Sequence, residues 1–315
     1  MVDSKHKWKA WLYLSPALVL LAIFTIYPIF NTIRIAFLDG YSSMHALQGK
    51  VYEFGIGNFE RVVEYQGFLT ALKNTMLLCL LTVPLSTILA LLISVTLNSI
   101  GPLRRILQTI YFLPYVTNSI AIGMVFAAMF NIVGSFHGTE NEIILTAGIV
   151  NNFLGLFGVE PINWINPGSE YWANLTVMVI YIVWNALPFK ILILLGGLQS
   201  VNKQYYDAAK VDGTPKWRVL TRITVPLLSP MIAYVVITGF IGGFKEYSSV
   251  VGIFGDKMGP IKYQGGAMNT MVGYIYQSIG ANKQGDAAAA AIILFAIILA
   301  VTLINLQVSK KRVHY

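Results

Sequence analysis

Residues Trp11 to Ile33 read WLYLSPALVLLAIFTIYPIFNTI, and none of these 23 side chains carries a charge. A helix rises about 1.5 Å per residue, so about 20 apolar residues cross the roughly 30 Å of hydrocarbon in a bilayer. The run is longer than the core of a signal peptide, and no small-residue cleavage site follows it. We therefore expect a retained first membrane span, with Lys5, Lys7 and Lys9 on its cytoplasmic side.

The rest of the chain has the same apolar character. Only 11% of its 315 residues are charged, against about 25% in a soluble domain. A water-soluble fold of this composition would expose an apolar surface that aggregates. The sequence predicts an all-α membrane protein with six spans, at about residues 11–37, 72–97, 106–130, 171–199, 223–244 and 287–308. These spans would form one transmembrane domain over residues 11–308, with short cytoplasmic ends at 1–10 and 309–315.

The positions of lysine and arginine predict which side each loop faces. With both ends in the cytoplasm, 13 of the 22 basic residues fall in cytoplasmic segments, as the positive-inside rule requires. The segment Asn131–Trp172 has no Lys or Arg but carries four glutamates, so we place it outside. Four lysines in the outer loop Lys245–Lys283 weaken this pattern, which long loops tolerate. The net charge of +8 therefore reflects topology, and nucleic acid is not expected as a partner.

Residues Ile143 to Val159 are uncharged and offer an alternative seventh span. They number only 17, fewer than a span usually needs. A span here would also invert everything downstream and place the five basic residues of the loop Ser200–Arg222 outside. We therefore expect a short amphipathic helix or a re-entrant segment on the outer face.

No motif in the sequence supplies an energy source. There is no G-x-x-x-x-G-K-[ST] pattern for ATP, no H-E-x-x-H pattern for zinc, and the single cysteine, Cys79, cannot form a Cys-based metal site. Carriers driven by ion gradients usually keep carboxylates in mid-membrane. The interiors of the predicted spans hold no Asp or Glu, and Lys190 is the single charge well inside one. We expect no enzyme activity and no cofactor, and a proton-coupled carrier is disfavoured.

The loop after the fourth predicted span contains the most informative stretch, YYDAAKVDGTPKWR at residues 205–218. A short helix is expected to end at Gly213, which can adopt the left-handed conformation that a helix C-terminus needs. Asp212 can bond to the nearby backbone, and Pro215 favours a new helix start just beyond. Asp207 and the tyrosines would then be presented away from the membrane, as in a docking element.

This stretch resembles the EAA signature of permeases from ATP-binding-cassette importers, which reads E-A-A-x-x-D-G-A followed by a spacer and a P-x-x-x-P pair. The matching positions are Asp207, Ala208, Ala209, Asp212, Gly213, Ile223, Pro226 and Pro230. The sequence departs from the pattern at Asp207, where Glu is usual, at Thr214, where Ala is usual, and at Leu220, where an aromatic residue is common. Aspartate keeps the negative charge on a shorter arm.

The resemblance implies that residues 203–218 form a coupling loop, which in this family lies in a groove of the ATPase subunit and transmits its closure to the spans. The residues expected to couple are Tyr206, Asp207, Ala208, Ala209, Asp212, Gly213 and Trp217. A partner ATPase dimer would bind ATP and magnesium. The family also implies the type I importer permease fold, a second homologous permease subunit and an extracytoplasmic sugar-binding protein, in the lipid of the cytoplasmic (inner) cell membrane.

Further elements resemble the sugar-specific branch, the maltose and multiple-sugar permeases. They are FGIGNF at 54–59, FLP at 112–114, INWINP at 162–167, GGLQS at 196–200 and the alanine-rich final span. The resemblance implies import of a sugar, with an oligosaccharide as the first choice, by alternating access. The alternatives are the same machine for another solute, such as a glycerophosphodiester or a polyamine, and a membrane assembly or signalling subunit that transports nothing.

Polar and aromatic residues in or beside the spans are candidates for the solute pathway, because a sugar needs hydrogen-bonding and stacking partners. They are Asn185, Lys190, Glu246, Tyr247, Tyr274, Tyr276 and Gln277. For each, the alternative is structural, as a partner for a neighbouring helix or an anchor at the membrane interface. The outer segments Glu140–Asn166 and Asp256–Ala281 are expected to meet the binding protein.

Overall fold

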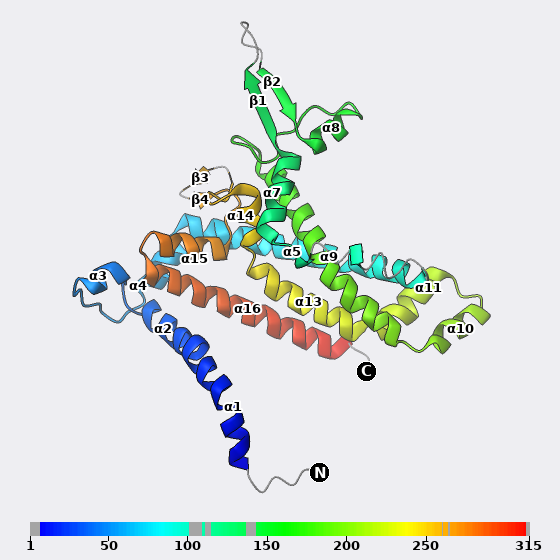
Figure 1. The fold of residues 1–315 in the computed structure, drawn as a ribbon, viewed down its shortest axis with the longest axis horizontal. Coiled ribbons are helices and arrows are strands. Elements are labelled where there is room, and N and C mark those ends of the chain that lie inside the picture. Colours follow the sequence, from blue (N-terminus) through cyan, green and yellow to red (C-terminus); the bar gives the residue numbers. More distant parts are fainter. Residues whose placement is uncertain are drawn as a thin grey trace. The chain divides into compact units, whose positions relative to one another are not determined.

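The computed structural model describes residues 7–100, 109–110, 115–136, 143–259, 261–263 and 265–312. Helices make up most of this part of the chain (Figure 1). The chain divides into two compact units, which are described separately here. The first contains Met1–Tyr65 and Ile275–Leu294, and the second contains Gln66–Tyr274 and Phe295–Tyr315. The predominantly helical architecture expected from the sequence is confirmed.

Four helices among the described residues are long and apolar enough to cross a bilayer, and they correspond to the first, second, fourth and sixth predicted spans. They are Trp8–Ala36, Gln66–Ser99, Tyr171–Ser200 and Gln284–Lys310. The fifth predicted span is a bent pair, Lys216–Leu227 and Ser229–Phe244, with an angle of 72° between its parts. The third, residues 106–130, is represented by the 12-residue helix Ser119–Phe130, because much of its first half lies outside the described residues. The count of six therefore stays a prediction.

The first unit begins with the first span, which is interrupted by a π-helical stretch. Pro28 has no backbone N–H, so the carbonyl four residues before it loses its helical partner and the chain relaxes into a wider turn. In chain order the elements are α1 (Lys7–Leu21), η1 (Ala22–Ile26), α2 (Tyr27–Ala36), α3 (Ser43–Leu47) and α4 (Gly57–Glu64), with the end of α15 (Met271–Gly280) and the start of α16 (Gln284–Arg312).

A group of polar side chains ties the segments of this unit together. Asn58 is fully buried and donates to two carbonyls at the end of the first span, each at 2.8 Å. Arg61 forms salt bridges with Asp39 at 2.8 Å and with Asp286 at 3.2 Å. Burial alone would lower the pKa of the Arg61 guanidinium, but its interactions with the two aspartates outweigh that effect and raise it. The FGIGNF element therefore has a structural role through Asn58.

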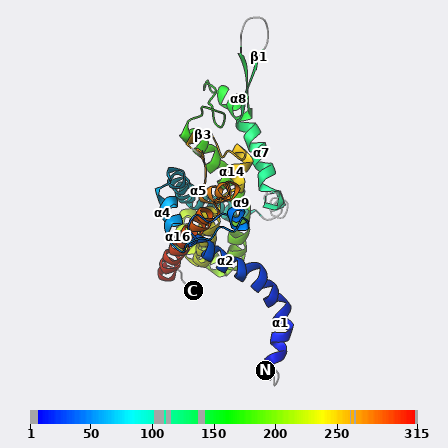
Figure 2. The same cartoon turned by 90° about the vertical axis from the view of Figure 1, so that its left-hand side faces the viewer.

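The second unit holds the remaining elements. In chain order they are α5 (Gln66–Ser99), α7 (Ser119–Phe130), β1 (Ile132–Phe136), β2 (Ile143–Ala147), α8 (Ile149–Gly155), α9 (Tyr171–Ser200), α10 (Lys203–Val211), α11 (Lys216–Val219), η2 (Leu220–Thr224), α12 (Val225–Leu227), α13 (Ser229–Phe244), α14 (Ser248–Phe254), β3 (Ile261–Tyr263), β4 (Gly265–Gly266), the start of α15 and the rest of α16. In both views α9 lies beside α5 (Figures 1 and 2).

Helix α9 is the centre of the core of this unit. Its first half packs with α7, α8 and α14 around Val177, Met178 and Tyr181. Its second half packs with α5 and α13 around Ile191 and Leu194. Because it is covered on several sides, α9 is apolar all round and does not show the one-sided pattern of a surface helix.

Glycines allow two close helix crossings. Gly239 and Gly243 of α13 face α5, and a Cβ built at Gly243 would lie 2.8 Å from the sulfur of Cys79. Gly123 of α7 and Gly252 of α14 face each other, so a Cβ on either would lie only 2.7 Å or 3.0 Å from the other Cα. Small residues are the usual means by which membrane helices approach this closely.

The segment between α7 and α9 differs from the prediction. Strands β1 and β2 form an antiparallel hairpin that continues from the end of α7 (Figures 1 and 2). Residues 143–159 are all described, and their longest helix, α8, has seven residues, so the rejected seventh span is absent. The helix expected over this segment is correct only for Ile149–Gly155, because the preceding β-branched residues pair as a strand. Short apolar runs are ambiguous between the two states.

Candidate functional site

The expected coupling loop contains α10, which ends in the turn that its sequence predicts. Gly213 has a φ of +63°, in the left-handed region. Its amide donates to the Lys210 carbonyl at 3.2 Å, and the Thr214 amide donates to the Ala209 carbonyl at 2.9 Å, which together form a Schellman motif. The predicted helix end is confirmed, and backbone bonds close it. The Asp212 carboxylate, which sequence reasoning gave a part in the turn, is exposed.

A second short helix follows the turn. Pro215 is the N-cap of α11, and its carbonyl accepts hydrogen bonds from the amides of Arg218 and Val219 at 2.9 Å and 3.1 Å. This confirms the predicted helix start. At the other end of the loop, Asn202 caps α10 by accepting from the Gln204 amide at 3.0 Å. Both helices of the segment therefore begin at defined residues.

The seven expected coupling residues divide into two groups by exposure. Ala209 is buried, and Tyr206 is half-buried with its hydroxyl 3.4 Å from the Thr224 hydroxyl, so Tyr206 connects α10 to the bent span. The other five are exposed, and Trp217 is 71% exposed. The exposed five are Asp207, Ala208, Asp212, Gly213 and Trp217. These five side chains are therefore accessible beside the fixed turn, where a partner could contact them.

The bent span directly follows this segment. Pro226 leaves the carbonyl of Arg222 without its helical donor, which explains the π-helical η2, as Pro28 explains η1. Pro230, four residues on, removes a second donor at the start of α13. The two prolines together account for the 72° bend between Leu227 and Ser229.

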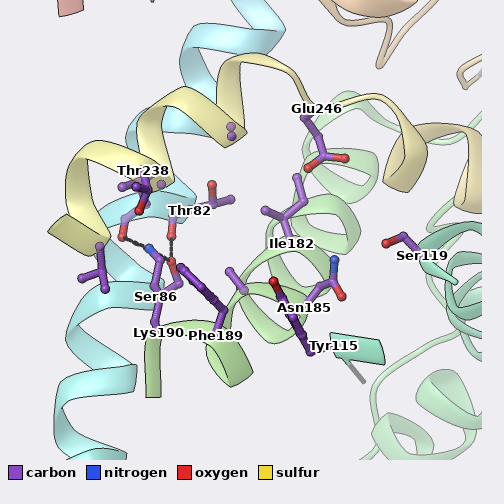
Figure 3. Close-up of a pocket in the computed structure, with 16 residues that line it drawn as sticks. Thr82, Ser86, Tyr115, Ser119, Ile182, Asn185, Phe189, Lys190, Thr238 and Glu246 are labelled. Atoms are coloured by element: carbon purple, nitrogen blue, oxygen red, sulfur yellow. Dashed lines mark hydrogen bonds between the residues drawn. The ribbon is translucent and has the colours of Figure 1, made fainter. Parts of the chain in front are cut away.

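A cavity of about 360 Å³ lies among α5, α9 and α13 in the second unit (Figure 3). Its polar lining comes from all three helices and from Glu246, two residues beyond α13. The polar and charged residues that line it on these elements are Thr82, Ser86, Asn185, Lys190, Thr238 and Glu246. Tyr115 and Ser119, beside and at the start of α7, complete one wall.

Lys190 is only 4% exposed, and its ammonium group is held by α5. Its Nζ donates to the Val83 carbonyl at 3.1 Å, to the Ser86 hydroxyl at 2.7 Å and to the Thr87 hydroxyl at 2.9 Å. An ammonium group has three protons, so this set uses all of them. On the α13 side, Gly239 has no side chain, and this makes room for the ammonium group. A Cβ at Gly239 would lie 3.2 Å from Lys190 Nζ. Lys190 therefore connects α5, α9 and α13.

Aromatic rings form another part of the cavity wall. Phe189 stacks on Tyr115 with ring centroids 5.8 Å apart and an interplanar angle of 17°. Tyr234 of α13 approaches the same phenylalanine at 6.5 Å. Tyr115 remains 50% exposed, and both rings line the cavity.

Glu246 contributes the carboxyl group of the cavity, from just beyond the end of α13. Its Oε1 accepts a hydrogen bond from the Ser249 amide at 3.2 Å, which links it to the first turn of α14. Burial raises the pKa of this carboxyl group above its usual value, against the opposing effect of its hydrogen bonds with Ser249 and the Tyr247 backbone. Figure 3 shows Glu246 and Lys190 on different sides of the cavity.

The structure brings together three of the seven expected pathway residues, namely Asn185, Lys190 and Glu246. Tyr247 instead packs beside the apolar cluster of α9 and α14. Tyr274 is buried with its ring 5.5 Å from that of Phe68, in an edge-on arrangement. Tyr276 and Gln277 belong to the other unit, where Tyr276 is exposed and Gln277 is half-buried.

Sequence reasoning missed the groups that complete the cavity. No sequence pattern identifies Tyr115 or Phe189 as a cavity residue. Tyr115 only follows the FLP element, and Phe189 only precedes Lys190. The hydroxyl groups of α5 could have been predicted from the sequence. Thr82 and Ser86 are four residues apart in an apolar run, and the same spacing separates Thr87 from Val83, whose carbonyl also bonds Lys190. That spacing puts each pair on one face of a helix.

Comparison with known proteins agrees with this architecture. Residues 82–314 match the family model of the binding-protein-dependent transport system inner membrane component. The chain belongs to this family of ATP-binding-cassette transporter permeases. It is therefore a multi-pass permease component of the inner membrane and is not itself an ATPase.

Particular relatives are sugar permeases. The chain is 30% identical over 244 residues to the lactose transport system permease protein LacF of Rhizobium radiobacter, covering 76% of this chain and 74% of the relative. It is 30% identical over 301 residues to the arabinooligosaccharides transport system permease protein AraP of Bacillus subtilis, covering 95% and 88%. A crystal structure of a bacterial alginate ABC transporter, in complex with an alginate pentasaccharide-bound periplasmic protein, has the same fold, with a TM-score of 0.78 over 98% of this chain and 96% of that chain, at 20% identity.

Proposed function

We propose that this permease imports an oligosaccharide by alternating access, in a complex with a second homologous permease, an ATPase dimer and an extracytoplasmic sugar-binding protein. The relatives with 30% identity are named for lactose and arabinooligosaccharides, which are built of two or more sugar units. Within the proposal, the chain makes six spans with both ends in the cytoplasm, and membrane lipid surrounds them. The ATP and magnesium of the cycle belong to the partner ATPase.

The composition of the cavity is the observation that carries the choice of a sugar. A sugar ring offers C–H faces, which pack on aromatic rings, and hydroxyls, which bond to amide and hydroxyl groups. The Tyr115–Phe189 stack in the cavity lining supplies the first kind of contact. Asn185 supplies the second, because its amide can both donate and accept a hydrogen bond. The Thr238 hydroxyl donates its proton to the Tyr234 carbonyl at 2.7 Å and can still accept. In this proposal Lys190 keeps its bonds to α5 and shapes the wall.

The fixed turn at Gly213 supports the proposed route for the energy. A docked ATPase would press on the exposed part of α10 and α11. The turn at Gly213 joins these two helices, and α11 continues without a break into η2 as the first part of the bent span. The bent span carries Thr238 and Gly239 of the cavity wall. A movement of the loop would therefore reach the cavity through one continuous piece of chain.

The test of the energy route is co-purification of the chain with its ATPase and sister permease. We expect Asp207→Arg to abolish retention of the ATPase, because the reversed charge lies on the exposed face of α10. The matched control is Asp256→Arg, at an exposed aspartate in the loop predicted to lie outside. Equal retention by wild type and both variants would overturn the docking assignment.

The test of the substrate is uptake by the complete importer reconstituted in proteoliposomes with its binding protein. We expect competition by lactose or arabino-oligosaccharides, and none by glycerophosphocholine or spermidine. Phe189→Ala should raise KM about 3–10-fold, because an aromatic contact is worth about 0.5–1.5 kcal/mol. Phe24→Ala, at an exposed phenylalanine of the first span, is the control. Transport of a non-sugar solute alone would refute the proposal.

A further inference from the structure

A second polar pocket, of about 390 Å³, lies at the beginnings of α5 and α9. The first turns of α5 form one wall, Tyr171 at the first position of α9 forms another, and the loop Gly266–Asn269 closes it. All of these residues belong to the second unit. By the topology proposed above, both helix ends face the outside of the cell.

The floor of this pocket is fixed by one fully buried side chain. The amide nitrogen of Asn74 donates to the carbonyls of Ala267 and Asn269, both at 2.9 Å. Its side-chain oxygen accepts from the Tyr171 hydroxyl at 2.8 Å. One residue along, the Thr75 hydroxyl accepts from the Met271 amide at 2.9 Å. Three segments that are distant in sequence therefore meet at Asn74, and the pocket keeps its shape without a ligand.

The pocket carries one positive charge and no negative one. The Lys73 ammonium lies over the Tyr171 ring, 5.7 Å from its centroid, in a cation–π contact that orients it. The other lining residues are Gln66, Gly67, Leu69, Thr70, Asn74, Gly266, Ala267 and Asn269, none of them acidic. Within the described part of the chain, both salt bridges belong to Arg61 and neither involves Lys73.

We propose that this pocket receives a carboxylate side chain from the surface of the extracytoplasmic binding protein. The inference rests on the proposed topology and names the contact that the binding protein makes. An oriented ammonium in a lining without acidic residues matches an Asp or Glu side chain in charge.

A solute sugar fits the pocket less well than a carboxylate does. Lys73 lies over one face of the Tyr171 ring, and the Tyr171 hydroxyl donates its proton to Asn74, so the hydroxyl offers no free donor to a sugar. Docking here would also act directly on α5 and α9, the two helices that meet at Lys190. Binding-protein arrival would thus be transmitted to the cavity through two rigid helices.

The chain offers a matched control for this proposal. Lys50 also lies over a tyrosine ring, that of Tyr52, at 5.3 Å from the centroid, in a segment predicted to be outside. It lines none of the pockets described here. Lys50→Glu and Lys73→Glu therefore make the same chemical change, and only one of them makes it in the pocket.

The experiment measures the affinity of the solute-loaded binding protein for the importer in lipid nanodiscs at low and high ionic strength. We expect Lys73→Glu to raise Kd about tenfold at low salt, to lose most of the salt dependence, and to leave the ATPase rate without binding protein unchanged. Lys73→Arg and Lys50→Glu should match wild type. Equal Kd values for wild type, Lys73→Glu and Lys50→Glu would overturn the proposal. So would an unchanged Kd combined with a selective loss of uptake of acidic saccharides, which would make the pocket a solute site.

Labelling separates a failure of this inference from a failure of the topology. Lys73→Cys, with Cys79→Ser as background, should react in intact cells with a membrane-impermeant maleimide. Reaction only after the cytoplasmic side is opened would refute the proposed orientation, and the docking pocket with it. Reaction from outside with an unchanged Kd would refute the docking pocket alone.

Discussion

The coupling segment and the cavity are built in opposite ways. In α10 and α11 the shape comes from the backbone, through the left-handed Gly213 and the capping carbonyl of Pro215, and most side chains are left exposed. In the cavity the shape comes from side chains, and Lys190 already uses every proton it has. A partner protein can therefore contact the exposed side chains of the coupling segment, whereas the side chains of the cavity mostly hold their own helices together.

The largest effect is expected where a side chain that shapes the cavity changes its charge. Lys190→Glu would place a carboxylate against the Val83 carbonyl and against two hydroxyls whose protons are already donated within α5, and we expect a loss of about 3–5 kcal/mol in stability. Lys190→Met should cost no more than about 1–2 kcal/mol, because the hydroxyls of Ser86 and Thr87 keep their bonds within α5.

Thermal unfolding of the two variants in the same detergent gives the comparison. If Lys190→Glu is as stable as Lys190→Met, the ammonium group does not hold α5, and the contrast between the two regions fails.

A smaller effect on stability, with a specific loss of binding, is expected in the coupling segment. Gly213→Val forces a β-branched residue into the left-handed region at a cost of about 1–2 kcal/mol and distorts the end of α10. ATPase retention should be lost. Gly158→Val makes the same change at a φ of +77° with open space around it, outside the segment.

Co-purification of both glycine variants distinguishes local strain from a docking defect. Gly158→Val should keep the ATPase while losing similar stability. Loss of the ATPase in both variants would show that general destabilisation, and not the shape of α10, decides binding.

The smallest effect is expected at Glu246 and depends on pH. Because burial raises its pKa in the folded state, folding disfavours the carboxylate, and the wild type loses stability as pH rises through the usual carboxyl pKa toward the folded value. Glu246→Gln cannot ionise and can still accept from the Ser249 amide. Its melting temperature should equal that of wild type at acidic pH and exceed it slightly at neutral pH. A constant difference across the range would contradict this.

The same contrast explains what could be predicted from the sequence. The turn at Gly213 and the start of α11 depend on neighbours within five residues, and both predictions are confirmed. Lys190 could be recognised as a charge inside a span, but its partners on α5 lie 103 to 107 residues away. Tyr276 lies in the other unit, so its place in the solute pathway stays a prediction that rests on residue type alone.

The meeting of Gly123 and Gly252 restricts how this protein can change over generations. Most contacts between helices involve two side chains, so a larger residue on one helix can be accommodated by a smaller one on the other. Here the added atom would meet the main chain itself, at 2.7 Å or 3.0 Å, and the opposite helix has nothing left to shorten. A larger residue at one of these two positions therefore cannot be compensated by a smaller residue at the other, as it can at ordinary core positions. They stay glycine together for as long as α7 and α14 cross at this point.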